Sequence, residues 1–165
     1  MPLFTRITLD DAFNLLLSRK VVGNEFKRVS KKINKLKDDD WRLWFGRFLL
    51  FVRSDAENSR FTDALFCLAE AEKIVANNPE GEKELKNLLN RDTLFLVFKF
   101  YYEASGIPSL ALLMALSYRN GWGVEADIEK AYEFANIAVN KLREDDPLHL
   151  MASDVLNAIL LEKSK

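Results

Sequence analysis

The sequence contains a single cysteine, Cys67, and a single histidine, His149, among its 165 residues. One cysteine cannot form an internal disulfide, and this pair cannot supply the four thiolate or imidazole ligands of a structural zinc site. Glycine and proline are also scarce, at six and four residues, while apolar residues make up 48% of the chain. That composition excludes a collagenous, low-complexity or disordered chain. At this length we expect one packed domain over residues 1–165.

Long apolar runs are missing as well. Runs such as those at residues 94–97 and 110–116 are far shorter than the roughly 20 residues that span a membrane. Residues 1–6 contain no apolar core of a signal peptide. We therefore expect a soluble, cytoplasmic protein with no membrane partner.

The chain has little net charge, −1, but its charges are distributed unevenly. Residues 1–53 contain 12 lysines and arginines against 6 acidic residues, whereas residues 54–165 contain 12 against 19. The first third is therefore cationic and the remainder anionic. Such an asymmetry affects which partners are attracted, and it says little about the fold.

Apolar residues recur at helical spacing along almost the whole chain, and polar capping residues mark where helices begin. These starts are Thr8 with Asp11, Ser59, Asn78 with Pro79, Asp127, and Asp146 with Pro147. Pro is well placed there because the first helical position needs no N–H donor. We predict an all-α protein of about nine helices, arranged as antiparallel helical hairpins that stack into a short α-solenoid.

Two segments need separate interpretation. The aromatic segment 94–102 fits a buried strand as well as a helix by periodicity, but a lone strand would leave its backbone groups unpaired. We predict a buried helix there, capped by Asp92 or Thr93. The segment 147–163 is predicted to be a C-terminal capping helix, with one apolar stripe toward the core and a polar opposite side.

Residues 108–142 resemble one repeat of the Sel1-like family, a relative of the tetratricopeptide repeat. Residues 41–76 resemble a more degenerate unit that lacks the Gly-x-Gly-Val loop, and alanines seven apart recur in both segments. The resemblance rests on Tyr118, Gly121, Gly123, Val124, Asp127, Lys130, Ala131, Phe134 and Ala138.

The resemblance implies both a local structure and a role. The two glycines would allow a tight loop between helices, Asp127 would cap the second helix, and the alanines would let helices pack closely. Ala115 and Leu142 stand where the family usually has glycine, which alters the contact with a following repeat. Sel1-like proteins are generally adaptors, so the resemblance implies that this chain binds another protein.

Motifs for catalysis are missing from the sequence. It has no Gly-x-x-x-x-Gly-Lys loop and no Gly-x-Gly-x-x-Gly fingerprint. Cys67 and His149 form a candidate nucleophile and base, but Cys67 lies between Phe66 and Leu68 in an apolar helix, where we expect a buried, inert thiol. We predict no catalytic residue, no metal site and no cofactor.

Seven residues are predicted to contact a partner. Trp122 lies between two glycines in a loop that we expect to be exposed, and tryptophan is over-represented among interface anchors. An equally weighted alternative is that Trp122 folds back over the adjacent hairpin. Glu125, Glu129 and Glu133 follow helical spacing and would form an anionic ridge beside it. Arg119, Asp145 and Asp146 complete the set.

We predict a non-catalytic protein-binding module, and more specifically a bacterial immunity-type inhibitor that neutralises a cognate toxin. The expected partner is a basic toxin domain, such as a nuclease. One alternative is an adaptor or secretion chaperone of the tetratricopeptide type, which would bind an extended peptide. Another is a nucleic-acid binder that uses the basic segment 27–37. A solvated helix face explains this segment better, because three aspartates follow it directly.

Overall fold

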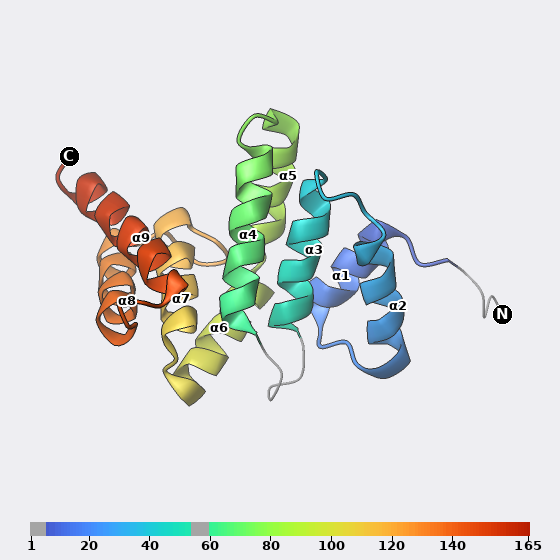
Figure 1. Cartoon of the computed structure of the whole chain (residues 1–165), viewed down its shortest axis with the longest axis horizontal. Coiled ribbons are helices and arrows are strands. Elements are labelled where there is room, and N and C mark those ends of the chain that lie inside the picture. The colour runs from blue at the N-terminus through green and yellow to red at the C-terminus, as the bar shows by residue number, and fades with distance from the viewer. Residues whose placement is uncertain (1–5, 54–59) are drawn as a thin grey trace. The chain divides into compact units, whose positions relative to one another are not determined.

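The computed structural model describes residues 6–53 and 60–165 (Figure 1). Over these residues the chain forms nine α-helices and no strand, which confirms the all-α prediction. The helices are α1 (Leu9–Ser18), α2 (Gly23–Asn34), α3 (Trp41–Val52), α4 (Phe61–Val75), α5 (Pro79–Leu89), α6 (Asp92–Ser105), α7 (Pro108–Asn120), α8 (Ile128–Lys141) and α9 (Pro147–Lys163). The predicted cap Ser59 lies outside the described residues. In that part of the chain, no helix has the length and apolar character needed to cross a membrane.

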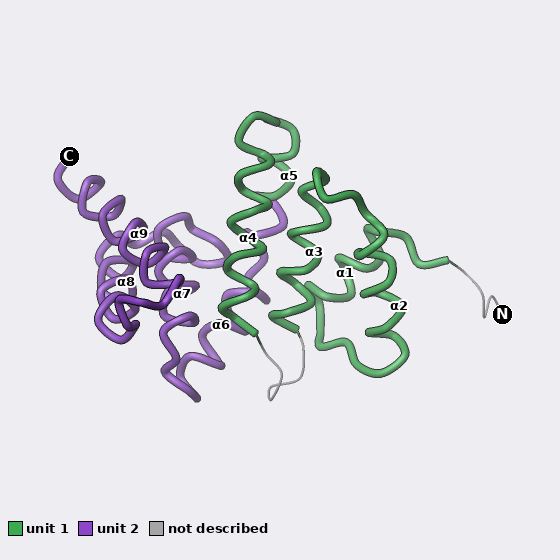
Figure 2. The backbone as a smooth tube through the Cα atoms, viewed as in Figure 1, with its two compact units in different colours: residues 1–85 green, residues 86–165 purple. Residues whose placement is uncertain are grey.

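Backbone contacts divide the chain into two compact units, residues 1–85 and 86–165 (Figure 2). Each unit has its own helical hairpins and its own core. That residues 1–165 form a single domain stays a prediction.

The centre of the first unit is the antiparallel hairpin of α3 and α4 (Figure 1), to which α2 and α1 add through their contacts with α3. Helix α3 is buried on two sides, because Leu43 and Leu50 are covered as well as the main stripe of Phe45 and Phe48. The ring of Phe13 from α1 meets Phe45 edge-on, with 5.5 Å between ring centroids. Aromatic burial therefore supplies much of this core.

A glycine sets how closely α2 approaches α3. A Cβ atom placed on Gly46, in the middle of α3, would lie 2.5 Å from Cγ2 of Ile33 on α2. Only glycine therefore permits this spacing of the two helices. The same spacing positions the side chains that line a pocket between α2 and α3.

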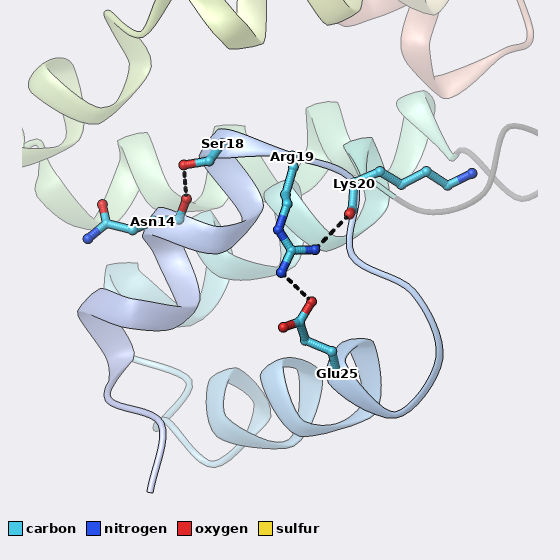
Figure 3. A network of polar contacts seen from close by, with 5 residues as sticks. All are labelled: Asn14, Ser18, Arg19, Lys20 and Glu25. Atoms are coloured by element: carbon cyan, nitrogen blue, oxygen red, sulfur yellow. Dashed lines mark hydrogen bonds and ion pairs between the residues drawn. The ribbon is translucent and has the colours of Figure 1, made fainter. Parts of the chain in front are cut away.

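The connection from α1 to α2 is held by polar contacts (Figure 3). Arg19 donates to the carboxylate of Glu25 at 2.7 Å and to the carbonyl oxygen of Lys20 at 3.4 Å. The hydroxyl of Ser18 donates to the carbonyl oxygen of Asn14 in the last turn of α1. Arg19 thus links the end of α1 to the first turn of α2.

Most of the predicted helix starts are confirmed. Thr8 and Asp11 form a reciprocal capping box, and the side chains of Asp127 and Asp146 accept hydrogen bonds from the first turns of α8 and α9. Asn78 accepts one from the backbone N–H of Gly81 at 3.0 Å. The predicted cap of α6 is wrong: the N-cap residue is Arg91, which makes no side-chain capping bond, and Asp92 is already helical.

The second unit is built around the α7–α8 hairpin, onto which α9 and α6 pack. Helix α7 is buried on nearly all sides from Ser109 to Ala115, as its apolar sequence predicts. Ala131, Ala135 and Ala138 of α8 are fully buried, because their small side chains admit the neighbouring helices. The rings of Tyr118 and Phe134 stack between α7 and α8, with a centroid separation of 5.8 Å.

The loop from α7 to α8 has the features that the repeat resemblance implies. Gly121 ends α7 with a φ of 71°, and Gly123 has a φ of 69°. Both values lie in the left-handed region that favours glycine. The N–H of Asp127 donates back to the carbonyl oxygen of Tyr118 at 2.9 Å, which closes the loop.

Two predicted burial patterns are wrong in part. Helix α6 is buried on one face only, because it packs on α7 through Leu94, Phe95 and Phe98, whereas Leu96 and Phe100 are 57% and 67% exposed. The outer side of α9 is not polar throughout. Its exposed residues include Leu150, Leu160 and Leu161.

Candidate functional site

The expectation of an exposed loop around Trp122 is wrong for the tryptophan itself, which is only 8% exposed. Its backbone N–H donates to the carbonyl oxygen of Ser117 at 2.9 Å, which draws the residue toward the end of α7. The burial agrees with the alternative in which Trp122 covers apolar groups. It offers little surface to a partner.

Two of the other predicted partner-binding residues hold α9 in place. Arg119 of α7 pairs with Glu162 of α9 at 2.8 Å. Glu129 of α8 pairs with Lys163 at 2.8 Å, and the ammonium of Lys163 also lies 4.4 Å from the ring centroid of Tyr132. These side chains therefore have structural contacts within the second unit.

The remaining predicted residues are more open. Glu125 and Glu133 are exposed, and Asp145 forms an exposed pair with Arg143 at 3.0 Å. Asp146 is the N-cap of α9, where it accepts from the N–H of Leu148 at 2.8 Å. The predicted anionic ridge thus consists of Glu125, Glu129 and Glu133. Of these three glutamates, Glu129 pairs with Lys163.

The candidate nucleophile has the environment of an inert thiol. Cys67 is buried in α4, and its burial raises the pKa of the thiol to about 11. At neutral pH it is therefore protonated, whereas the thiolate is the reactive form. His149 belongs to the other unit, and its Nδ1 atom lies 3.5 Å from the hydroxyl of Ser153. Across residues 6–53 and 60–165, no three His, Cys, Asp or Glu residues are grouped to hold a metal ion.

The first unit contains a pocket of about 270 Å³ between α2 and α3, which we call the α2–α3 pocket. Aromatic, aliphatic, amide and guanidinium side chains line it, and none of them is a carboxylate. The lining residues are Phe26, Ser30, Asn34, Arg47, Leu50, Phe51 and Arg60.

Helical spacing brings these residues together. Phe26, Ser30 and Asn34 are four residues apart and so share one side of α2. Arg47, Leu50 and Phe51 share one side of α3 by spacings of three and four. The pocket lies where these two sides face each other, and Arg60, just before α4, completes it.

Both arginines of the pocket are oriented by their neighbours. Nε of Arg47 donates to Oδ1 of Asn34 at 2.9 Å, and its guanidinium lies 5.0 Å from the ring centroid of Trp44. Arg60 pairs with Asp63, and its guanidinium lies 5.0 Å from the ring centroid of Phe51. A guanidinium held over a ring needs little further ordering when it binds a planar anion.

Further cations stand beside the pocket on α2. A helix turns by about 100° per residue, which places Lys27 and Lys31 next to Ser30 and Asn34 around the circumference of α2. Both lysines are exposed. The arrangement is therefore an apolar hollow with positive charge at its border. It is suited to recognition of a partly apolar, anionic group, and its lining holds no acid, base or thiol nucleophile.

This pocket is not predicted from the sequence, which indicates only a solvated helix face at residues 27–37. A signal was present in the repeat of Phe26, Ser30 and Asn34 on one side of a basic helix. Its meaning depends on α3, because Arg47, Leu50 and Phe51 supply the other wall.

Comparison of the chain with models of known protein families, with curated proteins and with solved structures finds no match. The Sel1-like resemblance of residues 108–142 therefore stays a prediction.

Proposed function

We propose that this chain is a non-catalytic protein-binding module that recognises a segment of another protein through the α2–α3 pocket. The observation that carries the proposal is the pocket itself, an apolar hollow with cationic neighbours on a scaffold of helical hairpins. Concave sites with an apolar lining and a few well-placed polar groups are typical of binding sites.

The size of the pocket favours side chains over a small-molecule ligand. Pockets for drug-sized ligands and cofactors usually measure roughly 300–1,000 Å³, whereas this one measures about 270 Å³. A volume of that order suits one or two side chains that project from a partner. The pocket is thus closer to the peptide-binding alternative than to a surface that blocks a globular active site.

Inhibition of a basic toxin by the second unit stays a prediction. Its proposed contact residues include the buried Trp122 and two residues, Arg119 and Glu129, that pair with α9. All three glutamates of its ridge are exposed, and Glu129 is the one that pairs with Lys163. Co-expression with a toxin encoded beside this gene tests the role. Protection that is lost in a Glu125→Lys, Glu133→Lys variant is expected if the acidic surface is used.

Selection from a display library of short random peptides on the immobilised full chain tests the proposed function. We expect enriched peptides that bind saturably in fluorescence anisotropy and compete with one another for one site. Failure to enrich any peptide that binds saturably would contradict the proposal.

Nucleic-acid binding through residues 27–37 has a separate test. If that alternative holds, binding of a labelled oligonucleotide will fall when Lys27, Lys31, Lys32 and Lys35 are all replaced by alanine. Binding that persists unchanged would reject it. Lys27, Lys31 and Lys35 are exposed, so their replacement removes little packing, whereas Lys32 is half-buried.

A further inference from the structure

The lining of the α2–α3 pocket is mainly apolar. Phe26 from α2 and the pair Leu50 and Phe51 from α3 supply the apolar side chains. Leu50 is 7% exposed, so it forms a surface already organised by the core below it. An apolar side chain that enters this hollow is removed from water, which favours binding.

The border of the pocket carries donors suited to carboxylates. Among residues 6–53 and 60–165, the hydrogen bonding of Arg47 is confined to Nε, which leaves the four N–H donors of its two Nη groups for a ligand. The planar guanidinium matches a carboxylate in two-point geometry. Lys27 and Lys31 add exposed positive charge on the same side of α2.

We infer that the α2–α3 pocket receives one bulky apolar side chain from a partner segment rich in aspartate and glutamate, whose carboxylates pair with Arg47 and the neighbouring lysines. This inference rests on the proposed function and names the chemistry of the partner. The apolar side chain supplies the anchor, and the carboxylates fix the direction of the segment across α2 and α3.

A protein segment fits these observations better than a nucleic acid does. Single-stranded nucleic acids bind by stacking their bases on aromatic rings along a cationic groove. Here one face of Trp44 and one face of Phe51 already carry guanidinium groups, each 5.0 Å from the ring centroid.

Labelled peptides test the inference by fluorescence anisotropy on the full chain. The main probe carries one phenylalanine flanked by glutamates. A second replaces the phenylalanine with alanine, and a third replaces the glutamates with lysines. We expect the first to bind at least about tenfold more tightly than either of the others, and to weaken as salt is raised. An oligothymidylate and phosphatidylserine vesicles are the probes for the other anionic partners.

Two matched pairs of variants locate the binding. Arg47→Glu reverses a charge at the pocket, and Arg143→Glu makes the same change on an exposed residue of the second unit. Ser30→Phe fills the pocket without changing charge, and Ser18→Phe places the same ring on an exposed position of α1. We expect each pocket variant to weaken the main probe at least about tenfold, and each control to leave it unchanged. Unchanged thermal unfolding midpoints show that the variants fold.

The outcomes separate this inference from the proposed function. Peptides that bind saturably but equally well with lysines, or that ignore Ser30→Phe, overturn the inference and leave the protein-binding function standing. Vesicles or oligothymidylate that bind in place of every peptide overturn both. If Arg47→Glu fails to fold, Ser30→Phe and the comparison of the three peptides decide the question.

Discussion

The guanidinium of Arg53, at the end of α3, donates to the carbonyl oxygen of Leu16 at 2.7 Å, and a second nitrogen donates to that of Leu17 at 3.0 Å. Both carbonyls belong to the last turn of α1, where a helix has no internal donors left for them. A cation is also favourable there, because the helix dipole is negative at that end. One side chain thus joins the end of α1 to the end of α3.

Replacement of Arg53 by alanine is expected to lower the free energy of unfolding by about 2 kcal/mol, since hydrogen bonds from charged donors contribute about 1.5–3 kcal/mol. Urea unfolding monitored by circular dichroism measures the loss. Arg19→Ala, which removes an exposed pair with Glu25 at 2.7 Å, is the control and should cost about 0.5 kcal/mol or less. Equal effects of the two variants would contradict the account of Arg53.

Gly123→Ala is expected to destabilise the second unit strongly. The new Cβ atom would lie 2.5 Å from the carbonyl oxygen of Arg91, on top of the strain of a φ of 69°. Gly23→Ala is a matched control, because Gly23 has a φ of 61° and no atom within 4 Å of such a Cβ. The control should cost about 1 kcal/mol from conformation alone. Thermal unfolding is measured for both variants, and the difference between their losses of stability gives the cost of the steric clash at residue 123. Similar losses of stability would contradict the prediction and show that the loop can move away from Arg91.

Asp40 is expected to stabilise α3 in a pH-dependent way. The carboxylate accepts from the side chain of Arg42 at 2.9 and 3.1 Å and from its backbone N–H at 3.0 Å. The side-chain bond to Arg42 is the main reason why the pKa of Asp40 is lowered. A lowered folded pKa stabilises the protein above the unfolded value of about 3.9, and this contribution is lost as the pH falls through the folded value.

The measurement is urea unfolding of Asp40→Ala against the native chain at pH 7 and at successively lower pH. We expect a loss of about 1 kcal/mol at pH 7, typical of a helix N-cap, that shrinks below about pH 4. Asp39→Ala, a change at the exposed neighbour, is the control. A loss that stays constant with pH would show that the carboxylate charge is not involved.

Cys67 is expected to react slowly with thiol reagents while the chain is folded, because burial raises the pKa of its thiol to about 11. An unfolded thiol ionises near pH 8.5. The unfolded state therefore loses its proton first as the pH rises, and stability falls between about pH 9 and 11. Relative to Cys67→Ala, the native chain should lose about 1.4 kcal/mol per pH unit there. Rapid labelling at pH 8, or parallel pH curves for the two proteins, would contradict this.

Features coded locally could be predicted from the sequence. Thr8, Asp127 and Asp146 mark helix starts because their side chains bond to backbone groups two or three residues away. The buried alanines of α8 could be predicted because they recur with the period of a helix. Such features need no knowledge of which helices are neighbours.

Features that depend on neighbouring helices could not be predicted in this way. The exposure of Leu150 and Leu161 on α9 depends on which face of that helix has a partner. The α2–α3 pocket depends on the close approach that Gly46 allows and on the alignment of Arg47 with Asn34 across it. The burial of Trp122 likewise follows from the folding of its loop onto α7 rather than from its spacing between two glycines.

The central claim is that the chain recognises its partner at the α2–α3 pocket, and nuclear magnetic resonance tests it most directly. Amide shifts of the isotope-labelled full chain would be followed as a peptide enriched by display selection is added. The account predicts that the largest changes occur at residues 26–34 and 47–51, which include the two walls of the pocket. Largest changes at residues 119–133 of the second unit would contradict it and would favour the acidic surface instead.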